Sequence, residues 1–137
     1  KDWWYADDVR DGRPLREWGT AYWQFDSQSR NFTHIPEHQV RGDDSAIIFD
    51  RALAYLEQQL TQGHDVFLQI WTHAPHKPVV SHPSLFSPQF DKLSPEAQNY
   101  FGALFGVDVQ MGRLQRMLDK HGVSNNTLTF FSSDNGK

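Results

Sequence analysis

Two short segments of this 137-residue chain carry side chains that can do chemistry. The first is Asp134-Asn135-Gly136, which places a carboxylate and a carboxamide side by side after an apolar stretch. Both side chains offer oxygen atoms, the ligands that Ca²⁺ and Mg²⁺ prefer. The same tripeptide is also a common turn, and on these residues alone the turn is the favoured interpretation.

The second segment is His73-Ala74-Pro75-His76-Lys77-Pro78, in which two prolines restrict the backbone around the imidazoles. Such a loop can donate hydrogen bonds to an anion, and a histidine in it can protonate a leaving group. His73 and His76 can instead bind a metal, although no third ligand lies nearby in the sequence. A single loop histidine is usually a surface residue, so this segment alone does not define a site.

Each segment follows a stretch that we expect to be a β-strand. Residues 65–71 (DVFLQIW) are nearly all apolar, as in a central strand that is covered on both faces. Residues 127–131 (TLTFF) are β-branched, aliphatic or aromatic, which also favours a strand. The two reactive segments therefore lie at the ends of two predicted strands.

Apolar residues at three-to-four spacing predict two helices. The first covers residues 43–62, with Asp44 or Ser45 as its cap and Gly63 as its stop. The second and longer helix begins at Ser94 and ends at Gly122. Its start has a capping serine, a proline in the first helical position and an acidic residue next.

The order helix, strand, helix, strand predicts how these elements are arranged. Two strands joined by a crossover helix most simply form a parallel, right-handed βαβ unit. Ligands of open α/β sheets bind beyond the carboxyl ends of the strands. We therefore expect an α/β fold, with a mainly parallel sheet flanked by helices. It would place His76 and Lys77 at the same sheet edge as Asp134 and Asn135.

The domain organisation follows from the same pattern. Residues 1–42 contain many aromatic side chains without a sustained period and are expected to be mostly loop, with a candidate strand at residues 21–25. Residues 43–137 are the helix–strand–helix–strand core. Residues 1–137 are thus expected to be a single partial domain. Because a metal-binding loop seldom ends a chain, we expect a piece of a longer polypeptide.

Composition excludes several classes of function. The net charge of −4 provides no broad basic surface for nucleic acid. The absence of cysteine excludes a disulfide framework, a thiolate metal site and a cysteine nucleophile within these residues. No apolar run is long enough to span a bilayer.

Three blocks, in this order and spacing, resemble the middle of a sulfatase of the alkaline phosphatase superfamily. They are FLQIWTHAPHKP, YFGALFGVDVQMG and NNTLTFFSSDNG, and the resemblance extends from about Asp43 to Gly136. It implies that the sheet belongs to an alkaline-phosphatase-like domain and that the parent protein hydrolyses sulfate esters. It also implies a sulfated small molecule or carbohydrate as substrate, the rest of the sulfatase chain as partner, and a periplasmic, secreted or lysosomal location.

The resemblance also implies roles for individual residues. Asp134 and Asn135 would be two ligands of a Ca²⁺ ion, with Mg²⁺ as the alternative. His76 would contact the sulfate ester and assist the leaving oxygen, while His73 and Lys77 would contact the substrate as its neighbours. Lys137 is a weaker candidate for sulfate contact, and no role is assigned to it.

The chain also departs from the family pattern. The family's nucleophile is a formylglycine made within a C/S-x-P-S-R motif, and that motif is absent here. The paired aspartates that complete the metal site are not identifiable, because neither Asp7-Asp8 nor Asp43-Asp44 follows a predicted buried strand. The nucleophile is therefore expected outside these residues, and the chain alone is expected to be inactive.

Two other functions stay open at this point. A phosphoric or phosphonic ester hydrolase of the same superfamily would carry Zn²⁺ or Mn²⁺ and a histidine next to the aspartate. Asn135 occupies that place, and a neutral oxygen ligand favours Ca²⁺. The other alternative is a non-catalytic α/β binding domain, which keeps the scaffold without the chemistry.

Overall fold

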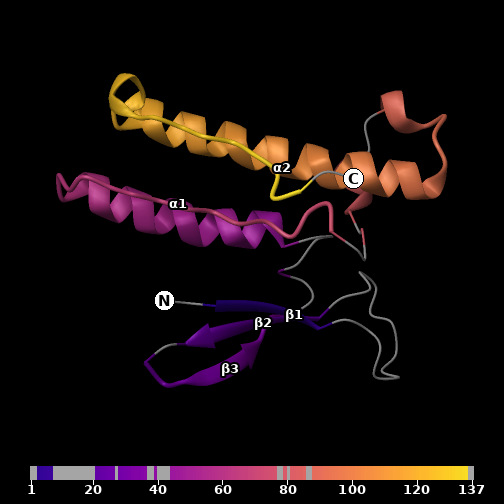
Figure 1. Cartoon of the computed structure of the whole chain (residues 1–137), viewed down its shortest axis with the longest axis horizontal. Helices are drawn as coiled ribbons and strands as arrows, with labels where there is room; N and C mark the ends of the chain where they lie inside the picture. The colour runs from indigo at the N-terminus through magenta and orange to yellow at the C-terminus, as the bar shows by residue number, and fades with distance from the viewer. Residues whose placement is uncertain are drawn as a thin grey trace.

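The computed structural model describes residues 3–7, 21–26, 28–36, 39, 44–76, 79, 81–85 and 88–135. In this part of the chain, two long helices pack side by side and a small antiparallel sheet lies on the α1 side of the pair (Figure 1). The strands are β1 (Trp3–Asp7), β2 (Ala21–Asp26) and β3 (Asn31–His34), and the helices are α1 (Ser45–Thr61) and α2 (Pro95–Lys120). The short 3₁₀ helices are η3 (Pro83–Leu85), η4 (Pro88–Phe90) and η5 (Ser124–Asn126).

Helix α1 confirms the first predicted helix. Asp44 stands at its N-cap position, and the backbone oxygen of Asp44 accepts a hydrogen bond from Ile48 N at 3.0 Å. Asp44 therefore occupies the N-cap position, but its side chain makes no capping hydrogen bond. After the last turn, Gly63 has a φ of +75°, a conformation that glycine adopts without strain.

Helix α2 begins as its sequence predicts. The hydroxyl oxygen of Ser94 accepts a hydrogen bond from Ala97 N at 3.3 Å, and Pro95 occupies the first turn. Glu96 in that turn and Lys120 in the last turn both complement the helix dipole. Searching the described residues finds no helix that is long and apolar enough to cross a membrane.

The two helices enclose the main apolar cluster. Leu53 and Leu56 of α1 are buried against Leu118 of α2. Complete burial of a leucine side chain contributes roughly 1.5–3 kcal/mol, so this seam is a large part of what holds the helices together. The partly buried residues around it are Leu60, Val66, Leu68, Leu114, Met117 and Val123.

The two predicted core strands are extended but unpaired. Residues 65–71 and 127–131 belong to no hydrogen-bonded ladder among the described residues. The expectation of a central strand covered on both faces is wrong here, since Phe67 is 91% exposed while Val66 and Leu68 pack on the helices. An apolar sequence favours burial, but a strand also needs a neighbour for its backbone groups. The predicted parallel sheet is thus not formed by the described residues.

Figure 1 shows how each extended segment follows its helix. The chain turns after α1 and runs back along it, and it turns again after α2 and runs back in the same direction. This direction is what a βαβ unit requires, even though the two segments share no ladder. The structure therefore has the connectivity of an α/β unit without its sheet.

Residues 1–42 contain two strands, β1 and β3, in addition to the candidate strand that the sequence predicts. The three strands form an antiparallel sheet in the order β1-β2-β3, and β2 confirms the candidate strand at residues 21–25. Cross-strand ring pairs accompany the β2–β3 pairing, with Phe25 and Phe32 centroids 4.9 Å apart. At the turn, Asp26 accepts a hydrogen bond from Gln28 N at 2.8 Å, and this bond lowers the pKa of the Asp26 carboxyl. The single-domain division itself stays a prediction.

Two helix glycines differ in the space around them. A Cβ added at Gly106 would lie 3.2 Å from Leu85 Cδ1, so the Leu85 side chain would have to shift to accept it. At Gly112 the nearest atom would be the flexible end of Arg116, at an ordinary 3.4 Å. We expect Gly112→Ala to raise the free energy of unfolding by roughly 0.5–1 kcal/mol, because alanine has the higher helix propensity. Gly106→Ala should raise the free energy of unfolding by less than Gly112→Ala does, or lower it, because the added methyl group would crowd Leu85. Equal gains in thermal melts would contradict the packing argument.

An ion pair between the helices predicts a pH dependence. Lys120 Nζ donates to Glu57 Oε1 at 2.5 Å, and this bond lowers the pKa of Glu57 from its usual 4.5; the charge of Lys120 contributes next. His121 also faces this carboxyl, with its Nε2 4.0 Å from Oε1. A lowered folded pKa stabilises the fold above pH 4.5, and that stabilisation is lost as the pH falls through the folded value.

We therefore expect Glu57→Gln to lower the melting temperature near neutral pH and to have a smaller effect in acid. Melts followed by circular dichroism between about pH 3 and pH 7 measure this difference. Lys120→Met is the matched variant, and its melting temperature should likewise approach that of wild type as the pH falls. A difference from wild type that stays constant with pH would refute the assignment.

Candidate functional site

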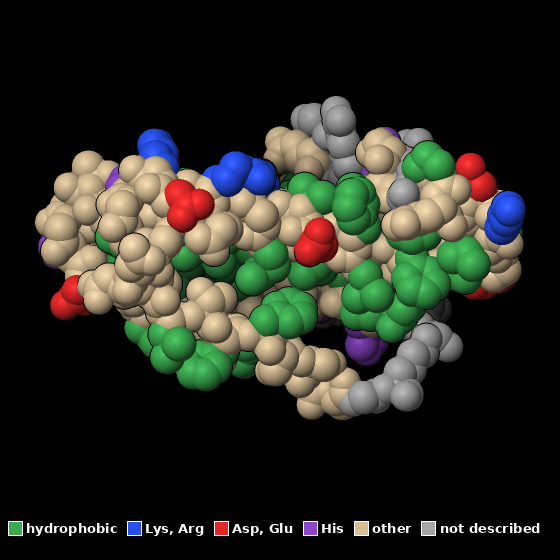
Figure 2. Space-filling view, turned by 90° about the horizontal axis from the view of Figure 1, so that it is seen from above, with side chains coloured by type: hydrophobic (Ala, Val, Ile, Leu, Met, Phe, Trp, Pro, Cys, Tyr) green, Lys and Arg blue, Asp and Glu red, His purple; other side chains and the backbone are tan. Residues whose placement is uncertain are grey.

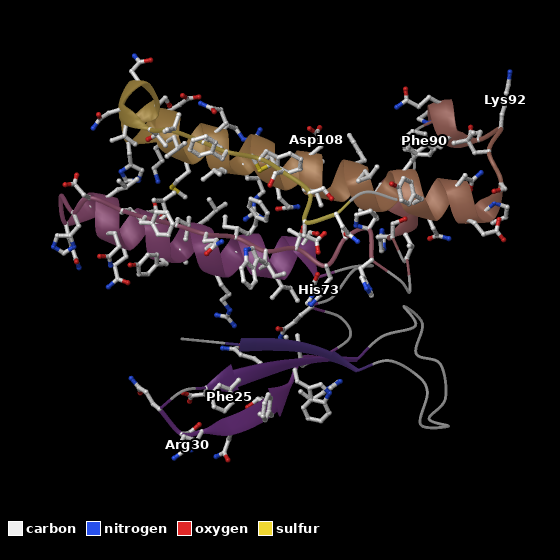
Figure 3. The ribbon with its side chains drawn as sticks, viewed as in Figure 1. Phe25, Arg30, His73, Phe90, Lys92 and Asp108 are labelled. Carbon is white, nitrogen blue, oxygen red and sulfur yellow. The ribbon has the colours of Figure 1, made fainter. Side chains whose placement is uncertain are left out.

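The clearest polar contact in the predicted site joins His73 to Asp44. The Nδ1 of His73 is hydrogen-bonded to Oδ2 of Asp44, a residue 29 positions earlier at the start of α1. The Asp44 side chain is 0% exposed, whereas that of His73 is 49% exposed. Figure 3 shows His73 beside the first turn of α1, between the helix and the small sheet. One imidazole is thus tied to a buried carboxylate while half of its surface faces outward.

The chain path explains this contact. Residues 65–71 run back along α1, so the residue after the extended segment reaches the N-terminal end of the helix (Figure 1). Half-buried apolar side chains on one face of the segment keep it against the helices. A segment of matching length must then end close to Asp44.

His76 belongs to the same turn as His73. The backbone N–H of His76 donates to the carbonyl oxygen of His73 at 2.6 Å, which closes the turn. The His76 side chain is exposed. Lys77, the third substrate-contact candidate, lies outside the described residues, as does Lys137. The structure therefore places two of the three predicted substrate contacts on one turn.

Asp134 and Asn135 lie on an exposed bend after residues 127–131. The hydroxyl of Ser133 donates to the backbone oxygen of Asn135 at 2.5 Å, which holds this bend together. Along the long axis of the molecule, the bend follows a segment that runs in the same direction as the one leading to His73 (Figure 1). Among the described residues, no group of three or more histidine, aspartate and glutamate side chains could hold a metal ion.

The comparison with known proteins now decides the family. The family model described as Sulfatase matches residues 1–137. This chain belongs to the sulfatase family. No solved structure matches it.

Two relatives support the assignment. The chain is 31% identical over 119 residues to the uncharacterized sulfatase YdeN of Escherichia coli (strain K12), covering 86% of this chain and 21% of that protein. It is also 31% identical over 87 residues to arylsulfatase G of Rattus norvegicus, covering 64% of this chain and 15% of that protein. This sulfatase chain thus spans about a fifth of the length of YdeN and less of arylsulfatase G. The family implies the alkaline-phosphatase-like α/β fold.

Sequence reasoning missed one residue of this region. Asp44 was expected to cap a helix, and the Asp43-Asp44 pair was given no other role. A usable signal was present in the order of elements, because a segment that returns along a helix ends where the helix begins. Asp43 lies outside the described residues, so the outcome for that pair concerns Asp44 alone.

The groove between the helices is a separate feature of this sulfatase chain. It has a volume of about 670 Å³, and charged side chains from both helices line its rim. Asp50 is paired with Arg113 at 2.6 Å and Glu57 with Lys120. These two ion pairs account for the charged side chains of the groove except Arg116, and none of the predicted site residues lines it. The groove therefore offers no support for the predicted site.

The buried pair predicts different costs for the two histidines. His73→Ala would leave the carboxylate of Asp44 buried without its partner, which should cost roughly 1–3 kcal/mol of folding free energy. His76→Ala removes an exposed side chain and should stay within about 0.5 kcal/mol of wild type. Chemical denaturation measures both values, and equal losses would contradict the burial argument.

Proposed function

We propose that the intact protein hydrolyses sulfate esters with the help of Ca²⁺ and a formylglycine nucleophile supplied from outside these residues. The observation that carries this proposal is the match of residues 1–137 to the Sulfatase family model. The matched chain includes the turn that carries His73 and His76, here called the imidazole turn, and the Asp134-Asn135 bend. Because this chain is only a small part of each relative, activity belongs to the intact protein.

The chemistry of Asp134 and Asn135 suits a hard cation. A carboxylate and a neutral carboxamide are both oxygen donors, and both side chains are exposed on one bend. Two residues do not complete the six to eight oxygens that Ca²⁺ takes, so further ligands must come from elsewhere in the protein. When bound, the ion would supply positive charge for the oxygens of the sulfate group.

His76 is proposed to act on the leaving group. Its imidazole is exposed and can therefore be reached by a substrate. It would donate a hydrogen bond or a proton to the ester oxygen as the bond to sulfur breaks. His73 and Lys77 would contact the sulfate oxygens as neighbours on the same loop.

The extended segments are proposed to join a parallel sheet in the intact protein. Both segments carry exposed apolar side chains, including Trp71, Leu128 and Phe130 at 73%, 78% and 85%. Figure 2 shows hydrophobic side chains gathered on the surface over α2 and beside it. The exposed members on α2 are Phe101, Leu104 and Phe105. Apolar surface of this extent favours a covering layer, and pairing would satisfy the strand backbones.

The first test is sulfate ester hydrolysis by the intact protein. We expect it to hydrolyse an aryl sulfate, and removal of Ca²⁺ by a chelator to abolish turnover until Ca²⁺ is restored. Asp134→Ala and Asn135→Ala should each lower kcat/KM by about 100-fold or more. Asp108→Ala, an exposed carboxylate on α2, is the matched control and should keep wild-type kinetics. Full activity in the Asp134→Ala protein would refute its role as a ligand.

The second test concerns this chain alone. The isolated 137-residue chain should show no metal-dependent turnover of an aryl sulfate, because it lacks the formylglycine motif. Turnover above the background of a heat-denatured sample would show that the chain carries its own nucleophile.

The third test separates sulfate from phosphate chemistry. Asn135→His replaces a neutral oxygen ligand with the nitrogen ligand that softer ions accept. In the intact protein this change should weaken the response to Ca²⁺ and raise phosphate ester hydrolysis relative to sulfate. Equal wild-type activity on both ester types would contradict the assignment to sulfate.

A further inference from the structure

Asp44 uses its carboxylate in an unusual way for a residue at a helix start. An aspartate in the N-cap position normally accepts a hydrogen bond from a backbone N–H of the first turn. Asp44 makes no such bond, and one of its oxygens is bonded to His73 Nδ1 instead. The other oxygen, Oδ1, is buried without a hydrogen-bond partner. The Asp44 carboxylate is therefore bonded to the imidazole of His73 and not to a backbone N–H of the first turn.

A buried carboxylate is costly unless it is paired. Asp44 is completely buried, and the imidazole of His73 is the partner that the structure gives it. The start of α1 adds the positive end of a helix dipole beside the carboxylate. A partner that presents an N–H group therefore suits this carboxylate.

The consequence for His73 concerns its tautomer. An ionised carboxylate only accepts hydrogen bonds, so Nδ1 must carry the proton that faces Asp44. The neutral imidazole then has its lone pair on Nε2, and the protonated imidazole has a second N–H there. The turn closed by His76 N and His73 O holds the backbone of the same residue. Both the orientation and the proton position of the ring are thus restrained.

We propose that Asp44 is a positioning residue that holds His73 in the Nδ1–H tautomer and reserves Nε2 for the sulfate ester. The inference rests on the proposed sulfatase function and deepens it, because it gives the half-exposed imidazole a defined chemical state. Asp44 itself does not touch the substrate. A carboxylate that orients a histidine in this way acts on catalysis through the ring.

The direct test is nuclear magnetic resonance of the ¹⁵N-labelled intact protein. The ¹⁵N shifts of His73 should show a protonated Nδ1 in wild type. Asp44→Asn keeps the shape and adds an N–H donor, so it should move the neutral ring toward the Nε2–H tautomer. Asp50→Asn, an exposed residue of the same helix, should leave His73 as in wild type. The same His73 tautomer in wild type and in Asp44→Asn would overturn the proposal.

Kinetics with an aryl sulfate supply the second readout. Asp44→Asn should lower kcat by about 10-fold or more with KM within about twofold, because the ring is misoriented while the binding groups remain. Asp50→Asn should keep the wild-type kcat. A wild-type kcat in Asp44→Asn would overturn the proposal. If the wild-type protein hydrolyses no sulfate ester, the proposed function fails, while the ¹⁵N shifts still decide the role of Asp44.

A second variant keeps the test decisive if Asp44→Asn does not fold. His73→Asn retains an amide N–H near the place of Nδ1 and removes Nε2. We expect this protein to fold with a melting temperature close to that of wild type and to lose at least about 10-fold in kcat. A folded His73→Asn protein with wild-type kcat would mean that the pair is only structural, and it would overturn the proposal.

Discussion

The packing of α1 against α2 is the interaction on which the rest of the described structure depends. Leu53, Leu56 and Leu118 form its buried centre, and the two extended segments lie along these same helices. Because each helix is followed at once by a segment that returns along it, the packing also sets where those segments end. The imidazole turn reaches the start of α1 for this reason. No local preference of residues 73–76 could have placed it there.

The contact at the start of α1 illustrates a competition between local and long-range bonds. Asp44 is well suited to cap a helix, and a cap contributes about 1 kcal/mol. The structure instead gives its carboxylate to an imidazole 29 residues away, and the burial of the carboxylate makes that bond the more consequential one. The first turn of α1 forms without a side-chain cap because tertiary packing supplies most helix stability.

The unpaired state of the two extended segments has a different origin. In residues 65–71 the side chains alternate between the helices and the outside, so that Val66 packs while Phe67 is exposed, whereas residues 127–131 are all exposed. This alternation is what one face of a sheet needs, and the other face and the backbone still lack partners in the described chain. The family assignment and the short coverage of the relatives are consistent with partners elsewhere in a larger domain. The Asp134-Asn135 bend follows one of these segments and is exposed, as that segment is.

The sequence by itself determined the two helices and their ends, because apolar spacing and capping are properties of neighbouring residues. Resemblance between residues identified the family, which the comparison confirmed. Only the tertiary structure decided that residues 65–71 stay outside a ladder and that β1 and β3 pair with the predicted strand β2 to form a sheet. It also decided that Asp44 binds His73. Strand pairing and a contact across 29 residues depend on which partners reach the same place, and a one-dimensional pattern does not contain that information.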